Sequence, residues 1–254
     1  MKQVIAICLS LLLLLSLSAC YLEDGVTEET RTYEIGSEIH TLHIRINAAD
    51  FRIEEGECFS VESNLRYLSV TEESGVLTLE DRGSGKLRYH NPVLTLTVPR
   101  EAVFDAVDLK TGAARITVDT LSTQHLRCEL GAGEVRFGQL EVLQSATVKG
   151  GAGKLTVAGG SLRQLTLEMG VGELELRGRL LGSNRLELGV GGSTLTLLGD
   201  REDYRLELEK GLGSISVDGK SLSDYGSSGN GTSCVEIHGG IGSIHVWFEE
   251  GERA

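Results

Sequence analysis

The sequence predicts an all-β protein, a parallel β-solenoid (β-helix) of about eight rungs with 19–21 residues in each rung. Three observations predict this class. A Gly-x-Gly turn recurs at that interval, apolar residues alternate with polar ones on both sides of it, and the chain has almost no stretch with helical periodicity. Strand-forming repeats of this length are typical of coils that stack and share one core.

The repeats align on the first glycine of each turn. The residues three and five before that glycine, and four and six after it, are then apolar or small in every repeat. Because a period of two places alternate side chains on opposite faces, each stretch is predicted to be a half-buried strand. The first glycines are Gly112, Gly131, Gly151, Gly170, Gly191, Gly211 and Gly240, and an eighth repeat around Asn47 keeps the apolar frame without glycines.

Stacking makes a specific prediction about the core. Equivalent positions of successive rungs should form columns, so Leu155, Leu174, Leu195 and Ile215 are predicted to lie in one buried column. The alternative is an antiparallel β-sandwich of hairpins on the same turns. The near-constant repeat length favours the solenoid, because stacked coils keep their path length whereas hairpin loops vary.

The glycines are expected at tight bends, where positive φ or close backbone approach favours glycine. The residue between them is small or apolar, and we expect it to point inward at the corner. These middle residues are Ala113, Ala132, Ala152, Val171, Gly192, Leu212 and Ile241.

Residues 1–19 have the features of a secretory signal, with an early Lys2 and an apolar run that ends in small residues. The last positions and the next residue, Leu17-Ser18-Ala19-Cys20, resemble the lipobox of bacterial lipoproteins. The resemblance implies cleavage before Cys20 and diacylglycerol on its sulfur. Simple secretion and an uncleaved membrane span are the alternatives, and the run is shorter than the roughly 20 residues that a span needs.

The mature chain divides into three predicted parts. Residues 20–36 are the lipidated cysteine and an acidic tether, and residues 37–248 are a single solenoid domain. Residues 54–100 lose the repeat and are predicted to form irregular hairpins that cap one end, while Trp247 and Phe248 should close the other. Residues 249–254 form a polar tail.

A Gly- and Ser-rich segment, residues 218–233, interrupts the last repeats. Inserted loops often carry the binding residues of a rigid scaffold. Asp224, Tyr225 and Asn230 in this loop are therefore the candidate binding residues, and a flexible excursion without a partner is the alternative.

Charge argues against one class of partner. Without Lys2 the chain has 23 basic and 37 acidic residues, a formal charge of −14. Nucleic acid is excluded on this ground, and an acidic surface would not bind anionic headgroups, so membrane contact is expected through the lipid anchor alone. Of the remaining cysteines, Cys128 is predicted to be a small core residue, and the redox state of Cys58 and Cys234 is left open.

No chemistry-bearing motif emerges from the residues. Gly131-Ala-Gly133 lacks the third glycine and following helix of a nucleotide loop, and no histidine has the spacing of a zinc site. His238 and His245 are expected on the surface. Outward carboxylates such as Glu173 and Glu187 are dispersed among Thr and Arg, unlike the clustered acids of a glycosidase. The sequence therefore predicts a protein that is not an enzyme, with no catalytic residue, metal or cofactor.

The motifs Leu94-Thr-Leu96-Thr-Val98-Pro99 and Phe104-Asp-Ala-Val107-Asp-Leu109-Lys-Thr-Gly112, with the Gly-x-Gly strand pairs that follow up to Val246, resemble a bacterial putative adhesin family with β-strand repeats, a domain of unknown function. The resemblance extends from about Ser37 to Phe248. It implies a right-handed β-solenoid at the cell envelope, and the family has no catalytic residues to transfer.

The expected function is that of a membrane-anchored, extracytoplasmic lipoprotein at the bacterial cell envelope. Its solenoid would present a surface for an envelope or host protein or glycan. An accessory sensor or scaffold of an envelope-stress system, and a carbohydrate-active β-helix enzyme, are the alternatives.

Overall fold

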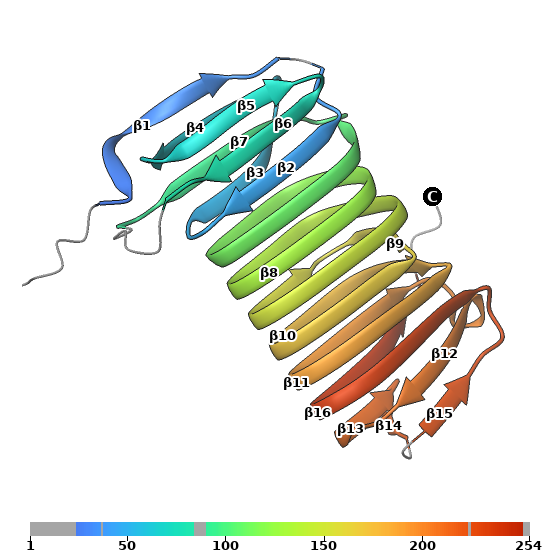
Figure 1. Cartoon of the computed structure of the whole chain (residues 1–254). Coiled ribbons are helices and arrows are strands. Elements are labelled where there is room, and N and C mark those ends of the chain that lie inside the picture. The colour runs from blue at the N-terminus through green and yellow to red at the C-terminus, as the bar shows by residue number, and fades with distance from the viewer. Residues whose placement is uncertain (1–23, 37, 84–89, 223–224, 251–254) are drawn as a thin grey trace, which may run out of the picture.

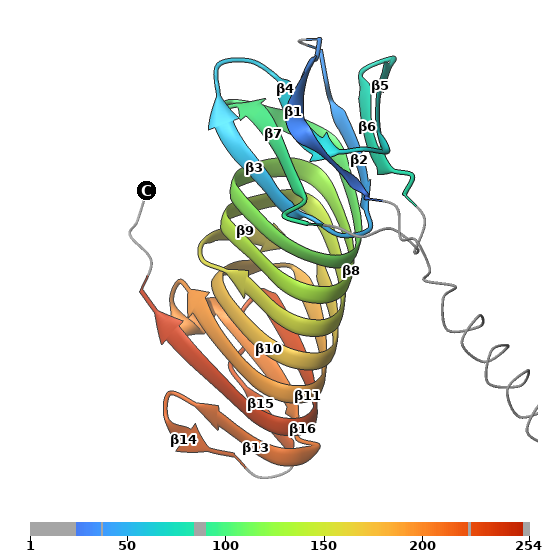
Figure 2. The same ribbon diagram turned by 90° about the vertical axis from the view of Figure 1, so that its left-hand side faces the viewer.

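The computed structural model describes residues 24–36, 38–83, 90–222 and 225–250, and it is all-β as predicted (Figure 1). Within these ranges the sole helical element is the 3-10 turn η1 (Arg201–Asp203). The strands form one large mixed sheet that is not closed, with parallel neighbours in the middle and antiparallel neighbours at both ends. Figures 1 and 2 show its coils stacked along one axis.

Strands in the middle of the sheet run parallel to one another. β10 lies beside β8 with Leu165 opposite Ala146, and β11 lies beside β10 with Leu186 opposite Leu167. Each repeat therefore pairs with the equivalent residues of the next, which excludes the antiparallel sandwich for this part of the chain. The strands are β8 (Val103–Val157), β9 (Gly160–Arg163), β10 (Leu165–Leu181), β11 (Ser183–Leu198) and β16 (Ser233–Glu249).

The predicted core is buried, but one repeat was placed two residues out of register. Leu155, Leu174 and Ile215 are each 2% exposed and Leu195 is fully buried. However, Gly172 lies opposite Gly191, so Leu195 lies beside Leu176 and not beside Leu174. The single column was therefore wrong.

The register error has an identifiable cause. The first glycine of this turn is Gly189, and its frame then contains Asn184 and Ser193, which are 2% and 8% exposed. These two buried polar residues occupy positions that the repeat rule expects to be apolar. A frame that starts two residues later, at Gly191, therefore matched the rule better.

The predicted inward direction of the middle residues is wrong. Val171 is 56% exposed, Ile241 53% and Leu212 76%, and Val190, the middle residue in the corrected register, is 45% exposed. The chain bends around these residues, so their side chains lie on the convex outer side of the corner.

The last strand lies inside the stack and not at its end. β16 pairs in parallel with β11 on one side and with β12 and β13 on the other, so the final repeat is inserted between the two that precede it. The segment predicted as an inserted loop, residues 218–233, is the connection that carries the chain back past the outer rung. It contains two short strands that pair antiparallel with that rung. The outer strands are β12 (Tyr204–Glu209), β13 (Leu212–Val217), β14 (Lys220–Ser221) and β15 (Tyr225–Ser228).

Trp247 and Phe248 consequently do not close the end of the core as predicted. Phe248 packs against Tyr204 with ring centroids 5.6 Å apart, and the Arg201 guanidinium lies 4.8 Å from its ring centroid. Trp247 is 42% exposed. Glu249, expected to begin the tail, still belongs to β16.

At the N-terminal end, too, the order of the repeats in space differs from their order in the sequence. β2 and β3, the repeat around Asn47, lie between β8 and the pair β6 and β7, all parallel. Residues 54–100 therefore contain the predicted antiparallel strands β4 and β5, but also two strands that extend the parallel stack. The bounds are β2 (Thr41–Ile46), β3 (Asp50–Gly56), β4 (Ser60–Leu65), β5 (Leu68–Glu73), β6 (Val76–Asp81) and β7 (Val93–Pro99).

The predicted tether, residues 20–36, is wrong from residue 26 onward. β1 (Val26–Glu34) pairs antiparallel with β4 and caps this end of the sheet. Val26 and Tyr33 pack against the core, which explains why an acidic segment is held as a strand. Edge strands at both ends of the stack are thus antiparallel and rich in polar residues, which protects the ends from further pairing.

Candidate interaction surface

Glycine backbones meet directly at the corners of the stack. Gly191 has φ +143°, and a Cβ added to it would overlap the carbonyl oxygen of Gly172 in the neighbouring rung. Gly172 has φ +146° and stands in the same relation to Gly153. Because positive φ and this close approach both favour glycine, the corners from Gly131 onward carry no side chain except that of the middle residue, whereas the first corner has Ala114 in place of the second glycine.

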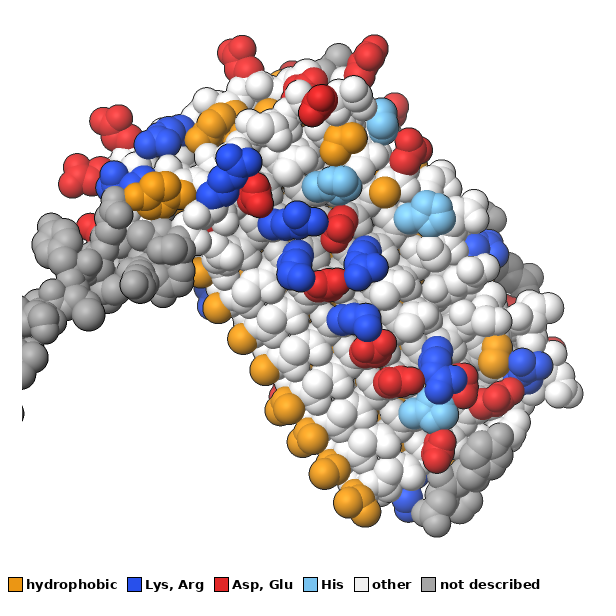
Figure 3. Space-filling view, viewed as in Figure 1, with side chains coloured by type: hydrophobic (Ala, Val, Ile, Leu, Met, Phe, Trp, Pro, Cys, Tyr) orange, Lys and Arg blue, Asp and Glu red, His pale blue; other side chains and the backbone are white. Residues whose placement is uncertain are grey.

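The middle residues form a single file on the outside of the corners, which we name the apolar row. In the register of the sheet Val171 lies opposite Ala152 and Val190, and Ile241 lies between Val190 and Leu212. Figure 3 shows this row along one edge of the molecule. In stack order its members are Ala113, Ala132, Ala152, Val171, Val190, Ile241 and Leu212.

A second row, which we name the charge ladder, lies two residues before the first glycine of each turn. Its members are linked across rungs: Lys110 Nζ is 2.8 Å from Glu129 Oε2, and Lys149 Nζ is 3.2 Å from Glu168 Oε2. In stack order the ladder is Lys110, Glu129, Lys149, Glu168, Glu187, His238 and Glu209.

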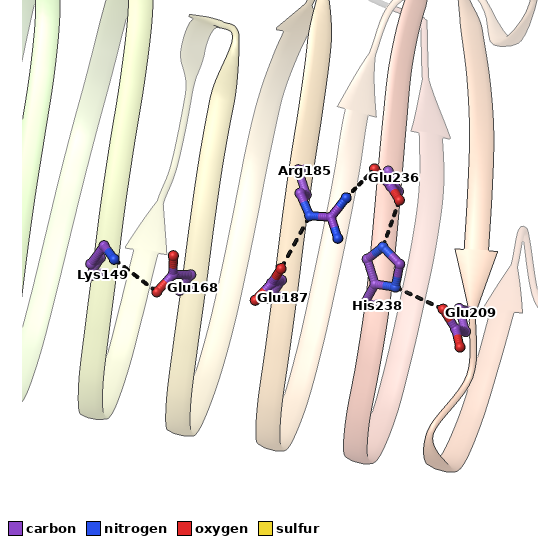
Figure 4. Close-up of polar contacts among 7 residues, drawn as sticks. All are labelled: Lys149, Glu168, Arg185, Glu187, Glu209, Glu236 and His238. Atoms are coloured by element: carbon purple, nitrogen blue, oxygen red, sulfur yellow. Dashed lines mark hydrogen bonds and ion pairs between the residues drawn. The ribbon is translucent and has the colours of Figure 1, made fainter.

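The ladder is most densely connected near its C-terminal end (Figure 4). His238 Nδ1 is 2.9 Å from Glu209 Oε2, and its Nε2 is 2.7 Å from Glu236 Oε1. Arg185 bridges Glu187, at 3.1 Å, and Glu236, at 2.8 Å. Three neighbouring rungs are therefore joined by side chains as well as by the backbone.

These contacts hold the acids in their charged form. Hydrogen bonds from Lys110 and Arg127 lower the pKa of Glu129 to about 2. The hydrogen bond with His238 lowers the pKa of Glu236, and the same bond raises the pKa of His238. A general acid needs the opposite shift, since it must hold a proton near neutral pH.

A shallow open groove runs beside the ladder, across the rungs of β8, β10, β11 and β16. Lys149, Glu168, Glu187 and His238 line one side, and Met169 and Leu188 line the floor. The first glycines of the turns form the other margin, next to the apolar row. The corner thus offers charged groups, bare backbone and aliphatic side chains in adjacent strips.

The structure places two of the three predicted binding residues, and only one of them lies next to this surface. Tyr225 begins β15 opposite Glu209, the last member of the charge ladder, and Asn230 is exposed in the connection that leads to β16. Asp224 and Cys20 lie outside the described residues, as does the predicted signal peptide, residues 1–19. Sequence reasoning missed the apolar row. The middle residues after the three alanines are larger, but the shifted register interrupted this series with Gly192 in place of Val190.

The cysteines follow the sequence expectation where the structure tests it. Cys128 is fully buried, and desolvation raises the pKa of its thiol to about 12, as expected for a small core residue. Cys58 is exposed and Cys234 is partly buried, and both are free thiols.

Two further findings concern the described part of the chain. No cluster of three or more His, Cys, Asp or Glu side chains suited to a metal ion occurs among these residues. Within the same ranges, no helix has the length and apolar character needed to cross a membrane.

No protein-family model and no curated protein sequence matches the chain. Solved structures similar to it include a putative cell adhesion protein from Clostridium sporogenes ATCC 15579, with 12% identity over 87% of this chain and 99% of the other at a TM-score of 0.40. A putative adhesin from Bacteroides fragilis NCTC 9343 has 13% identity over 87% and 98%, with a TM-score of 0.38. A putative adhesin from Parabacteroides merdae ATCC 43184 has 11% identity over 87% and 95%, with a TM-score of 0.37.

These proteins are of the kind that the sequence motifs resemble. At such identities and TM-scores the likeness carries no information about what this chain binds, so its function is argued from its own surface.

The protonation of His238 should affect stability. Its pKa is raised in the folded state, so the stabilisation is complete below the unfolded value of about 6.5 and is lost as pH rises through the folded value. We expect His238→Gln to lower the free energy of unfolding by up to about 1 kcal/mol at pH 5.5 and by less at pH 9. Urea denaturation at both pH values measures this, and an equal loss at both would contradict it.

Proposed function

We propose that the chain is a non-catalytic adhesin, anchored by lipid to the outer face of a bacterial membrane, that binds through the apolar row. The observation that carries the proposal is the exposure of Val171, Val190, Ile241 and Leu212, which ranges from 45% to 76% on four adjacent rungs. A continuous line of solvent-exposed aliphatic side chains on a rigid sheet indicates an interaction site, whereas single exposed apolar residues do not.

The fold suits this role as a right-handed parallel β-solenoid. The parallel register of β8, β10, β11 and β16 supports the solenoid, and the right-handed path follows the strong preference of parallel crossover connections. Such a stack is rigid along its axis and repeats the same surface at each rung. A crystal structure with antiparallel neighbours among these repeats would contradict this part of the proposal.

The anchor places the stack with respect to the membrane. Only five residues lie between Cys20 and Val26, where β1 starts. Fully extended, the six residue steps from Cys20 to Val26 span at most about 20 Å. The end of the stack with β1 would therefore lie near the membrane, and the end with β12 and β13, where Leu212 is found, would point away from it (Figure 1).

Lipidation is tested at Cys20. In cells fed a labelled fatty acid, we expect the wild-type chain to carry the label and Cys20→Ser to lose it, since the thiol is the attachment point. Cys58→Ser removes an exposed cysteine that the proposal leaves unmodified, and it should label like the wild type. A label that persists in Cys20→Ser, or that never reaches the wild type, would contradict the anchor.

Adhesion is tested with vesicles that carry the full chain, applied to surfaces coated with envelope glycans, envelope proteins or the chain itself. The double variant Ile241→Ser/Leu212→Ser should reduce retention at least tenfold, because it removes the largest side chains of the row. Leu143→Ser is the matched control, because Leu143 is 43% exposed but lies outside the row. Equal retention of all three proteins would sink the proposed role of the row.

A further inference from the structure

We propose that the apolar row binds the apolar row of a second copy of this chain, which lies antiparallel to the first. This inference rests on the adhesive function proposed above and names its partner. It follows from two features of the same seven rungs: the increase in side-chain size along the apolar row and the order of the charges along the ladder.

Side-chain size increases in one direction along the row. It begins with Ala113, Ala132 and Ala152 and ends with Ile241 and Leu212. In an antiparallel pair centred on Val171, each small residue meets a large one of the second copy. Ala113 lies opposite Leu212, Ala132 opposite Ile241, and Ala152 opposite Val190. The distance between the two copies is then the same along the whole row. In a parallel pair the alanines would face alanines and leave a gap at that end.

The same two-fold symmetry places the charge ladder of the second copy in the opposite order to that of the first. A two-fold axis across the row brings the ladder of one copy beside the ladder of the other, in opposite order. Lys110 then faces Glu209, Glu129 faces His238, and Lys149 faces Glu187. All three pairs are attractive when His238 is protonated, and two of them are at any neutral pH. Complementary charges of this kind select orientation more than they add affinity.

A parallel pair would be repelled. Its two-fold axis runs along the stack and brings the ladder of one copy beside the residues two positions after the middle residue of each turn in the other. On the first four rungs these neighbours have like charge: Lys110 with Arg115, Glu129 with Glu134, Lys149 with Lys154, and Glu168 with Glu173. Repulsion on every one of these rungs is an element of specificity against the parallel arrangement.

Two acids meet their own copies at the antiparallel axis. Glu168 and Glu173 both belong to the central rung, which contains Val171. Each has a lysine of its own chain nearby, with Lys149 3.2 Å from Glu168 and Lys154 3.6 Å from Glu173. These lysines offset the repulsion at the centre.

The size of the contact fits adhesion between membranes. Six rung spacings of about 4.8 Å make a row roughly 29 Å long. A single file of that length buries less than the roughly 800 Å² per partner of a stable complex, so one contact is weak. Because the pair is antiparallel, the two anchors lie at opposite ends, and the copies belong to facing membranes. Many anchored copies then act together, which multiplies a weak affinity.

Cysteine crosslinking tests the arrangement. The full chain carrying Cys8→Ser, Cys20→Ser, Cys58→Ser and Cys234→Ser is used, so the result does not depend on lipidation. Val171→Cys lies at the axis and should form disulfide-linked dimers alone. Ala113→Cys and Leu212→Cys should each give at least tenfold less dimer alone but should crosslink efficiently when the two variants are mixed. Leu143→Cys reports random collision.

Charge reversal supplies a second measurement in the Val171→Cys background. Lys110→Glu should reduce dimer formation severalfold, and adding Glu209→Lys should restore it, which a merely structural effect would not do. Efficient self-crosslinking at 113 and 212 would overturn the antiparallel order. Crosslinking at 171 no greater than at 143 would overturn self-association, while adhesion of vesicles to another surface would still support the proposed function.

Discussion

Gly191→Ala is expected to destabilise the protein by about 4 kcal/mol or more, a loss comparable with the whole stability of many domains. Gly191 has φ +143°, and the added methyl group would overlap the carbonyl oxygen of Gly172. Neither group can move freely, because both belong to hydrogen-bonded rungs that pair over their whole length. The strain would therefore spread into the neighbouring rungs.

The adjacent residue provides a matched control. A Cβ on Gly192 would find only Ser243 Oγ, at 4.0 Å, and Gly192 does not have positive φ. We expect Gly192→Ala to change the free energy of unfolding by less than about 1 kcal/mol. Denaturant unfolding of the two variants separates these cases. Equal losses would mean that the corner is not placed at Gly189-Val190-Gly191, and the corrected register would fail.

Asn184→Leu is expected to cost about 3 kcal/mol, although leucine suits an apolar column. The Asn184 side chain is 2% exposed and connects three strands. Its Oδ1 accepts a hydrogen bond from the Leu165 amide at 3.0 Å, and its Nδ2 donates to the Cys234 carbonyl at 3.0 Å. The substitution would leave both backbone groups without this partner inside the sheet.

Thr166→Leu is the control for this prediction, because Thr166 is exposed on the neighbouring strand and opposite Arg185. It should change stability by about 0.5 kcal/mol or less. The free energy of unfolding of both variants, measured in urea, provides the comparison. If Asn184→Leu were neutral or stabilising, the amide would not be the link that joins β10, β11 and β16.

The repeat pattern predicted most of the fold because it records burial directly. Alternation identified the strands, and the frame residues such as Leu174 and Leu195 are buried as expected. The same rule failed at Asn184, since a buried amide that satisfies backbone groups cannot be distinguished by residue type from an exposed one. The order of the terminal strands could not be predicted either. Every rung has the same pattern of apolar residues, so the pattern does not indicate which rungs are adjacent.

The candidate surface was less predictable. The apolar character of the middle residues led us to expect Val171 and Leu212 inside, but the chain bends at these positions and leaves both side chains exposed. The inserted segment attracted attention by its composition, yet its length is explained by the return of β16 between β11 and β12. Function had to be argued from exposed residues, which only the structure identifies.

The central claim is that the apolar row joins copies of this chain on facing membranes, and mixing two vesicle populations tests it most directly. Vesicles of two colours, both carrying the full lipidated chain, should aggregate, and the Ile241→Ser/Leu212→Ser chain should abolish this. Vesicles with the chain should not aggregate with bare vesicles. Equal aggregation with bare vesicles, or none between two chain-bearing populations, would contradict the claim.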